Sequence, residues 1–120
     1  MEGGQTNEFR PLILVAEDDD SNFKLIKAII GKKCDIQWAK NGEEIVALFK
    51  EYGKEAKAIL MDIKMPVMNG LDATKIIREE NKEIPIIMQT AYAFSSDKEN
   101  AMNAGASEVL VKPITLSILR

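Results

Sequence analysis

The sequence predicts an α/β fold in which five strands, each followed by a helix, form one parallel sheet with helices on both faces. Three observations support this prediction. Short apolar runs alternate with segments whose apolar residues recur at helical spacing, turn-forming Gly, Pro or Asn residues separate them, and 120 residues fit one domain. Because parallel crossovers are right-handed by default, we expect a doubly wound sheet. We predict a flexible tail at residues 1–9 and one domain at residues 10–120.

The first strand and helix have the clearest signals. Residues 12–16 are an unbroken apolar run that is too short for a helix and suits a strand buried on both faces. Asp20 or Ser21 is the expected cap of the next helix, because either side-chain oxygen can accept hydrogen bonds from free N–H groups at a helix start. Gly31 is expected to end this helix.

The later units are predicted from the same two signals, a strand-like run and then a helical repeat of apolar residues. Asn41-Gly42 is interpreted as a turn and Gly53 as a helix end. The expected strands lie at residues 35–39, 58–61, 85–90 and 108–111. The expected helices lie at residues 43–52, at about 71–80, and from a cap at Ser95 or Ser96 to Gly105.

The last unit is short. Thr115 is the expected cap of a fifth helix, but only about one and a half turns fit before Arg120. Helices of that length are marginal without support. We therefore expect the last helix to be truncated and the natural chain to continue past Arg120. A sheet face left uncovered would promote a homodimer or fraying of the chain end.

The composition excludes several kinds of chemistry. The chain has no histidine, which rules out Ser-His or Cys-His catalysis, histidine-bound zinc and a phosphodonor histidine within it. Cys34 is the single cysteine, so neither an internal disulfide nor a cysteine metal site can form. A net charge of -3 without a basic block argues against direct nucleic-acid binding. No run is long enough to span a membrane and the polar start has no signal-peptide core, so we expect a cytoplasmic domain without membrane contact.

Polar side chains lie at the ends of four predicted strands. Glu17 and Asp18 follow the first strand, and Asp62 follows the third. Thr90 ends the fourth strand, and Lys112 follows the fifth. The carboxyl ends of parallel strands lie along one edge of the sheet, which is where open α/β folds bind ligands. We therefore expect these five side chains to converge.

The chemistry of this set suits phosphoryl transfer. Three neighbouring carboxylates repel one another unless a hard cation neutralises them, and carboxylate, carbonyl and water oxygens suit Mg²⁺. An aspartate beside Mg²⁺, here Asp62, can attack phosphorus to give an acyl phosphate. Lys112 and the Thr90 hydroxyl can stabilise charge on the transferred group, and Ala91 is small enough to leave it space. Taken singly, each residue also has an ordinary structural interpretation, as a cap, a strand residue or a surface lysine.

Five segments form a longer pattern. They are Ile13-Leu14-Val15-Ala16-Glu17-Asp18, Leu60-Met61-Asp62-Ile63-Lys64-Met65-Pro66-Val67-Met68-Asn69-Gly70, Thr90-Ala91, Gly105-Ala106 and Lys112-Pro113. This pattern closely resembles the receiver domain of two-component response regulators and covers about residues 11–119. The resemblance implies a flavodoxin-like (βα)5 fold and a phosphorelay function. The implied phosphodonor is a phosphohistidine on a histidine kinase or a histidine phosphotransfer domain.

The resemblance also implies a set of metal ligands. Asp62 would be the phosphoacceptor, and Asp18 would bind Mg²⁺ directly. Glu17 would bind the ion through water, and the backbone carbonyl of Lys64 would be a further ligand. From their positions two residues after Asp62 and Thr90, we also predict that the side chains of Lys64 and Tyr92 flank the site, restrict water and slow autodephosphorylation.

The resemblance further implies how the site responds. Thr90 would engage the phosphoryl group and move on activation, Lys112 would pair with a phosphoryl oxygen, and the Lys112-Pro113 bond would be cis. The sequence departs from the family at Val109, where receivers often carry Tyr or Phe as the partner of the threonine. Because valine has few χ1 rotamers, output is expected to depend more on the loop and helix that follow Thr90.

Several readings of the parent protein and of the site stay open. The residues within the motifs are most similar to those in receivers of hybrid sensor histidine kinases. The alternatives are the receiver of a DNA-binding response regulator and a docking-only module. A phosphatase of the haloacid dehalogenase type needs an acid where this chain has Lys64. A flavin-binding module needs a phosphate-binding loop where this chain has Glu17, Asp18 and Asp19. We expect no enzyme activity beyond the chain's own phosphorylation and dephosphorylation.

Overall fold

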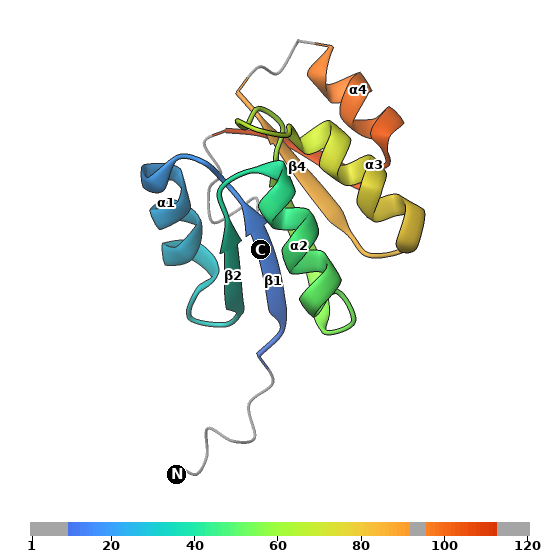
Figure 1. The fold of residues 1–120 in the computed structure, drawn as a ribbon. Helices are drawn as coiled ribbons and strands as arrows, with labels where there is room; N and C mark the ends of the chain where they lie inside the picture. The colour runs from blue at the N-terminus through green and yellow to red at the C-terminus, as the bar shows by residue number, and fades with distance from the viewer. Residues whose placement is uncertain (1–9, 92–95, 113–120) are drawn as a thin grey trace, which may run out of the picture.

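Strands and helices alternate along the chain, as the sequence predicts. The computed structural model describes residues 10–91 and 96–112. Its elements are β1 (Leu12–Ala16), α1 (Asp20–Ile30), β2 (Asp35–Ala39), α2 (Gly42–Tyr52), β3 (Ala56–Asp62), α3 (Gly70–Glu80), β4 (Ile86–Thr90), α4 (Asp97–Ala104) and β5 (Glu108–Val111). All strand pairs are parallel, and their order is β2-β1-β3-β4-β5 (Figure 1). The predicted doubly wound parallel sheet is therefore confirmed.

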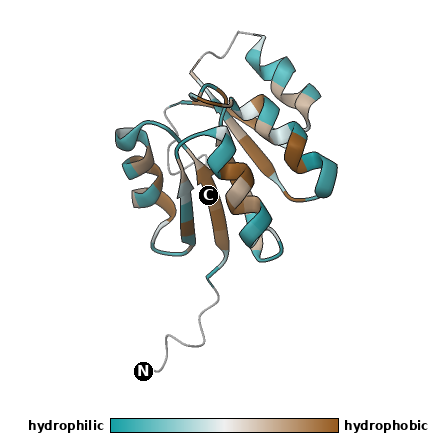
Figure 2. Cartoon of the chain, in the orientation of Figure 1, coloured by the Kyte–Doolittle hydropathy of each residue, from teal (hydrophilic) through white to brown (hydrophobic). Residues whose placement is uncertain are grey.

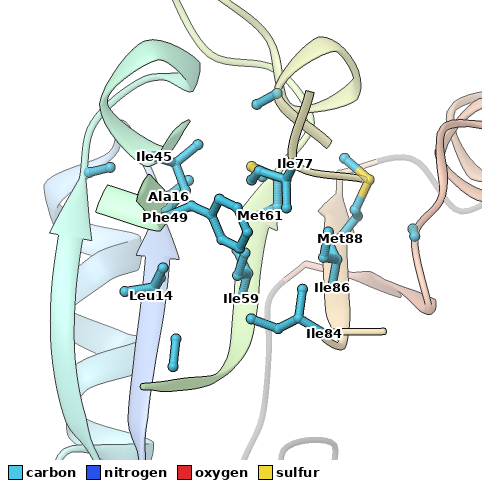
Figure 3. Packing of buried hydrophobic residues seen from close by; sticks show 14 of the residues in the cluster. Leu14, Ala16, Ile45, Phe49, Ile59, Met61, Ile77, Ile84, Ile86 and Met88 are labelled. Atoms are coloured by element: carbon cyan, nitrogen blue, oxygen red, sulfur yellow. The ribbon is translucent and has the colours of Figure 1, made fainter. Parts of the chain in front are cut away.

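Helices cover both faces of the sheet. On one face, Phe23 and Ile26 of α1 pack with Val15 and Leu60. On the other face, α2, α3 and α4 lie side by side (Figure 1). Residues of the larger core on that face are drawn in Figure 3: Leu14, Ala16, Ile45, Phe49, Ile59, Met61, Ile77, Ile84, Ile86 and Met88. In Figure 2 the strands are largely hydrophobic, whereas the helices carry both hydrophobic and hydrophilic residues. This difference is expected for a parallel sheet that is buried on both faces.

Three helices begin with an Asx cap. The predicted cap of α1 at Asp20 or Ser21 is wrong, because Asp19 has an extended backbone and its side chain accepts hydrogen bonds from the second and third N–H groups after it. Asn41 and Asn69 cap α2 and α3 in the same way. Each Asn-Gly pair therefore starts a helix one residue earlier than predicted, because the asparagine side chain satisfies an N–H group of the first turn.

The other boundaries differ from the predictions in small ways. β3 extends beyond the predicted residues at both ends, and β4 begins at Ile86 rather than at Pro85. Ser96 occupies the N-cap position of α4, but its side chain makes no capping hydrogen bond. Gly105 ends α4 with a φ of 116°, a left-handed conformation that glycine adopts without a steric penalty. β5 matches the predicted residues.

Some predictions lie outside the described residues. They concern the tail at residues 1–9, Tyr92, Ser95, the Lys112-Pro113 bond, and the fifth helix from Thr115. Across residues 10–91 and 96–112, none of the helices combines the length and the apolar character that a membrane span needs.

Candidate functional site

Three carboxylates converge at the carboxyl edge of the sheet. Glu17 and Asp18 follow β1, and Asp62 ends β3, the strand next to it. One oxygen from each side chain lies within 4.8 Å of the other two. Glu17 is completely buried and Asp62 is 4% exposed, whereas Asp18 is exposed to solvent. The three acids therefore meet where the sequence predicts, but only one of them faces water.

Lys112 brings a positive charge to this cluster. Its ammonium nitrogen Nζ lies 3.1 Å from Asp62 Oδ2 and 3.4 Å from Glu17 Oε1. The backbone N–H of Lys112 donates to the carbonyl oxygen of Thr90 at 2.8 Å, which fixes where the side chain starts. One ammonium thus bridges two acids. With Asp18 included, three carboxylates face one ammonium, so the fully ionised cluster has two negative charges in excess.

The buried position changes how Asp62 and Lys112 titrate. Burial, and next the negative charge of Glu17, raise the pKa of Asp62 to about 7, although Lys112 opposes the shift. Burial alone would lower the pKa of Lys112, but the charges of Asp62 and Glu17 outweigh burial and raise that pKa. The ionised form of Asp62 is therefore costly to hold here, and a cation beside it would reduce that cost.

The loop between β3 and α3 is shaped closely around Asp62. A Cβ atom at Gly70, where α3 begins, would lie 2.1 Å from the Asp62 carbonyl oxygen, so only glycine fits there. Val67 has a φ of 70°, which is strained for a β-branched residue. The Met68 N–H donates to the Pro66 carbonyl at 2.7 Å across that residue. The loop therefore follows a tight path that places the carboxylate at the strand end.

Thr90 ends β4 at the same edge and contacts the start of α4. Its hydroxyl Oγ1 donates to Asp97 Oδ2 at 3.3 Å, and the Lys64 ammonium lies 3.9 Å from the same oxygen. Thr90 is almost fully buried, and Asp97 is partly buried. Asp97 could not be predicted from the sequence, because its contact with Thr90 depends on how α4 returns to the end of β4. Val109 packs, partly buried, against the larger core.

The donors that hold Glu17 were likewise not predicted from the sequence. Asn22 Nδ2 on α1 donates to Glu17 Oε1, and the Asp19 N–H donates to Glu17 Oε2 at 3.2 Å. Trp38 Nε1, at the end of β2, donates to the Glu17 carbonyl at 2.8 Å. The sequence did contain one indication that Asn22 lies near Glu17. Once Asp19 is known as the cap, Asn22 falls in the first turn of α1, on the side of the strand end.

The donor set fits a hard divalent cation. Its candidate ligand atoms are carboxylate oxygens of Glu17, Asp18 and Asp62, and the ionised cluster has negative charge in excess. Mg²⁺ prefers such oxygen ligands together with water, whereas structural zinc sites are built from Cys and His. These three acids are therefore the residues that could hold the ion, and the Lys64 carbonyl stays a predicted ligand.

The doubly wound sheet carries acids, a lysine and a hydroxyl at its carboxyl edge, which is the set expected of a domain that receives a phosphoryl group. The sequence matches the family model of the response regulator receiver domain over residues 13–120, and the chain belongs to this family. It is a receiver domain of phosphorelay signalling. The resemblance seen in the sequence is therefore confirmed.

Among curated proteins, the chain is similar to Hybrid signal transduction histidine kinase I of Dictyostelium discoideum. The two are 41% identical over 115 residues, which cover 89% of this chain and 7% of the kinase. The chain thus spans only a small part of that relative.

Among solved structures, the chain is similar to two receiver domains. One is the receiver domain of the sensor histidine kinase PA1611 from Pseudomonas aeruginosa PAO1, which has a magnesium ion in its active-site cleft. Its TM-score is 0.84 at 32% identity over 92% of each chain. The other is the receiver domain of the response regulator Ssk1 from Saccharomyces cerevisiae, solved with the histidine phosphotransfer protein Ypd1. Its TM-score is 0.83 at 30% identity over 92% of this chain and 83% of that one.

Proposed function

We propose that the domain accepts a phosphoryl group on Asp62 from a phosphohistidine, with Mg²⁺ at the acidic cluster, and changes conformation in response. One observation carries the proposal. Asp62 is a buried carboxylate 3.1 Å from the Lys112 ammonium and within reach of Glu17 and Asp18. Membership of the receiver family supports the same role.

We propose Asp18 and Asp62 as direct ligands of Mg²⁺, Glu17 as a ligand through water, and the Lys64 carbonyl as a further ligand. The oxygen-only donor set and the excess of negative charge support this assignment. The magnesium-containing receiver of PA1611, at 32% identity, supports the choice of ion. When bound, Mg²⁺ supplies positive charge beside the oxygens of the transferred group.

In the proposed transfer, one carboxylate oxygen of Asp62 forms a bond to phosphorus while the P–N bond of the donor phosphohistidine breaks. The donor ring takes up a proton from solvent and leaves as neutral imidazole, and the product is an acyl phosphate. The Lys112 ammonium already lies 3.1 Å from Asp62 Oδ2 and would pair with one phosphoryl oxygen. The Thr90 hydroxyl would donate to a second phosphoryl oxygen. Both groups therefore stabilise the negative charge on the oxygens of the transferred phosphoryl group.

The conformational response is proposed to begin at Thr90. In this structure its hydroxyl donates to Asp97, the first residue of α4. A hydroxyl that turns to the phosphoryl group releases Asp97, and the start of α4 loses a hydrogen bond. Val109 offers no aromatic ring to follow this movement, so α4 and the loop before it are the proposed output elements.

We propose a histidine kinase or histidine phosphotransfer domain as the donor and a hybrid sensor histidine kinase as the parent. The Ssk1 receiver solved with Ypd1 supports the first assignment, and the Dictyostelium hybrid kinase supports the second. We assign the receiver domain to residues 10–120 and place it on the cytoplasmic side of such a parent. The chain itself catalyses only its own phosphorylation and dephosphorylation.

The proposal is tested by incubating the chain with Mg²⁺ and acetyl phosphate and measuring its intact mass. We expect a mass increase of one phosphoryl group that requires Mg²⁺ and is lost in the Asp62→Asn variant. Asp72→Asn, a change at an exposed carboxylate on α3, is the matched control and should keep the adduct. An adduct that persists in Asp62→Asn, or no adduct in the unsubstituted chain, would contradict the proposal.

A further inference from the structure

Glu17 is anchored at both of its carboxylate oxygens. It is completely buried at the end of β1. Its Oε1 accepts a hydrogen bond from Asn22 Nδ2 and lies 3.4 Å from the Lys112 ammonium, and its Oε2 accepts from the Asp19 N–H at 3.2 Å. A carboxylate has about four acceptor positions. Protein donors therefore occupy most of the acceptor capacity of Glu17.

Asn22 is held in place by the start of α1. Its backbone N–H donates to the capping Asp19 Oδ1 at 3.2 Å, so it sits in the first turn with its side chain on Glu17. Because an ionised carboxylate only accepts hydrogen bonds, the Asn22 atom that faces it must be the amide nitrogen. The next residue, Phe23, stacks on Trp38 with ring centroids 3.8 Å apart. Trp38 in turn holds the Glu17 carbonyl, so backbone and side chain of Glu17 are fixed together.

This anchoring decides how Glu17 can meet a cation. A held carboxylate can still accept a hydrogen bond from a water molecule that belongs to a hydrated ion. Coordination through both oxygens, which Ca²⁺ often takes, would require the carboxylate to turn away from Asn22, because Asn22 and Lys112 already lie on Oε1. Mg²⁺ dehydrates reluctantly and keeps several waters, whereas Ca²⁺ takes about six to eight oxygen ligands. An anchored Glu17 therefore suits Mg²⁺ better than Ca²⁺.

We propose that Asn22 is a specificity-determining residue of the cation site, whose amide holds Glu17 for water-mediated contact and so favours Mg²⁺ over Ca²⁺. Asn22 acts through Glu17 and does not itself reach the ion, so it is a positioning residue. The inference rests on the proposed function, because it takes the acidic cluster as the cation site.

The test compares affinities for Mg²⁺ alone and for Ca²⁺ alone in the unsubstituted chain and in Asn22→Ala. Calorimetry gives both dissociation constants. Emission from Trp38, the single tryptophan, gives them independently, because its indole N–H is bonded to the Glu17 carbonyl. Ser21→Ala, at the exposed neighbouring position of α1, is the matched control. Asn22→Ser keeps a polar side chain too short to reach Glu17 and serves if the alanine variant does not fold.

We expect Asn22→Ala to weaken Mg²⁺ binding about tenfold, the usual cost of losing a group that orients a metal ligand. Ca²⁺ binding should be unchanged or tighter, because the released carboxylate can coordinate through both oxygens, so the preference for Mg²⁺ falls about tenfold. Ser21→Ala should match the unsubstituted chain. Equal losses for both ions, or no change for either, would overturn the role of Asn22 while leaving the proposed function intact. No cation binding by the unsubstituted chain would overturn the proposed function and this inference with it.

Discussion

At the scale of single residues, the ionised carboxylate of Asp62 is the most costly feature of the site. It lies in a buried position beside the equally buried Glu17, and one lysine balances the pair only in part. The pKa of about 7 expresses that cost, with burial as its largest cause. The same features make the carboxylate available for a cation and for an incoming phosphoryl group. The ionised Asp62 carboxylate thus lowers the stability of the metal-free protein and at the same time makes the site reactive.

The Asp62→Asn variant is predicted to be more stable than the unsubstituted protein when Mg²⁺ is absent and the pH is above about 7. The folded-state pKa of about 7 exceeds the ordinary value of 3.8, so the folded state binds the proton more tightly. Stability that is fully present below about pH 4 is therefore lost as the pH rises towards 7. Asparagine cannot ionise and avoids this loss. The predicted difference in unfolding free energy is on the order of a few kcal/mol, since one pKa unit is worth about 1.4 kcal/mol.

Urea unfolding at a series of pH values, without metal, measures this difference. The gap between variant and unsubstituted protein should open between about pH 4 and 7 and stay constant above that range. Saturating Mg²⁺ should narrow the gap, because only the aspartate gains from the cation. A gap that is the same at every pH would contradict the account of Asp62.

The residues of the site differ in how far the sequence predicts them. Glu17, Asp62 and Lys112 follow from one rule, that polar residues after apolar strands meet at one edge of a parallel sheet. Asn22 and Asp97 do not follow from it, because both lie on helices. Their contacts depend on the rotation of each helix about its axis and on the path of the loop before it, which strand-end spacing does not define.

At the scale of elements, α4 is the shortest helix in the described part of the chain, and its first residue is bonded to the site. Its N-cap residue makes no side-chain hydrogen bond, and its first residue, Asp97, is bonded to Thr90 instead. The helix is eight residues long, whereas α1, α2 and α3 have eleven each. Short helices depend on tertiary contacts for stability. Loss of the hydrogen bond from Thr90 should therefore lower the stability of the whole of α4.

Asp97→Ala is predicted to loosen α4 in the unphosphorylated protein. The change removes the Thr90 hydrogen bond, whose net contribution is about 1 kcal/mol, together with the weaker, exposed ion pair with Lys64, and so should raise amide exchange in α4 about fivefold. Glu99→Ala is the matched control, because it removes another acid from the first turn without a hydrogen bond to Thr90. Hydrogen exchange followed by mass spectrometry gives the readout. Equal effects of the two variants would mean that the helix dipole, not the contact with Thr90, holds α4.

The path of the β3–α3 loop requires that residue 70 has no side chain. Gly70→Ala would place a Cβ atom 2.1 Å from the Asp62 carbonyl oxygen. Backbone atoms must move to relieve that contact, so we predict a loss of about 3 kcal/mol or more in unfolding free energy. The urea midpoint, with an unchanged slope, measures the loss. A variant as stable as the unsubstituted protein would show that the loop is less tightly held than its contacts indicate.

Element boundaries are less predictable than element order. The order of strands and helices follows from hydrophobic periodicity, which is strong in this chain. The starts of α2 and α3 are displaced by one residue and that of α1 by one or two, because Asp19, Asn41 and Asn69 cap the helices through their own side chains. An Asn-Gly pair suits both a turn and a helix start, and only the hydrogen bonds of the folded chain distinguish the two.

At the scale of the whole molecule, the topology itself assembles the site. The order β2-β1-β3-β4-β5 places β1 beside β3 in the middle of the sheet, so Glu17 and Asp62 become neighbours although 45 positions separate them in the sequence. Lys112 reaches them from the far edge strand, β5. A cation or phosphoryl group at the site therefore links separate parts of the chain and should stabilise the fold as a unit.

Mg²⁺ is accordingly predicted to raise the thermal midpoint of the protein. At a concentration about one hundred times its dissociation constant, the expected gain is about 2.7 kcal/mol, or a shift of several degrees. Asp18→Asn removes an exposed candidate ligand and should abolish most of the shift without unfolding the protein. Asp20→Asn, an exposed change on α1, is the control and should keep it. A full shift in Asp18→Asn would place the ion elsewhere.

The central claim is that Asp62, and no other carboxylate, receives the phosphoryl group. The most direct measurement is to reduce the phosphorylated protein with borohydride, which converts an acyl phosphate of aspartate to homoserine, and to locate the product by peptide mass spectrometry. The account predicts homoserine at position 62 only, dependent on Mg²⁺. Homoserine at position 18, or at any other aspartate while Asp62 is unchanged, would contradict it.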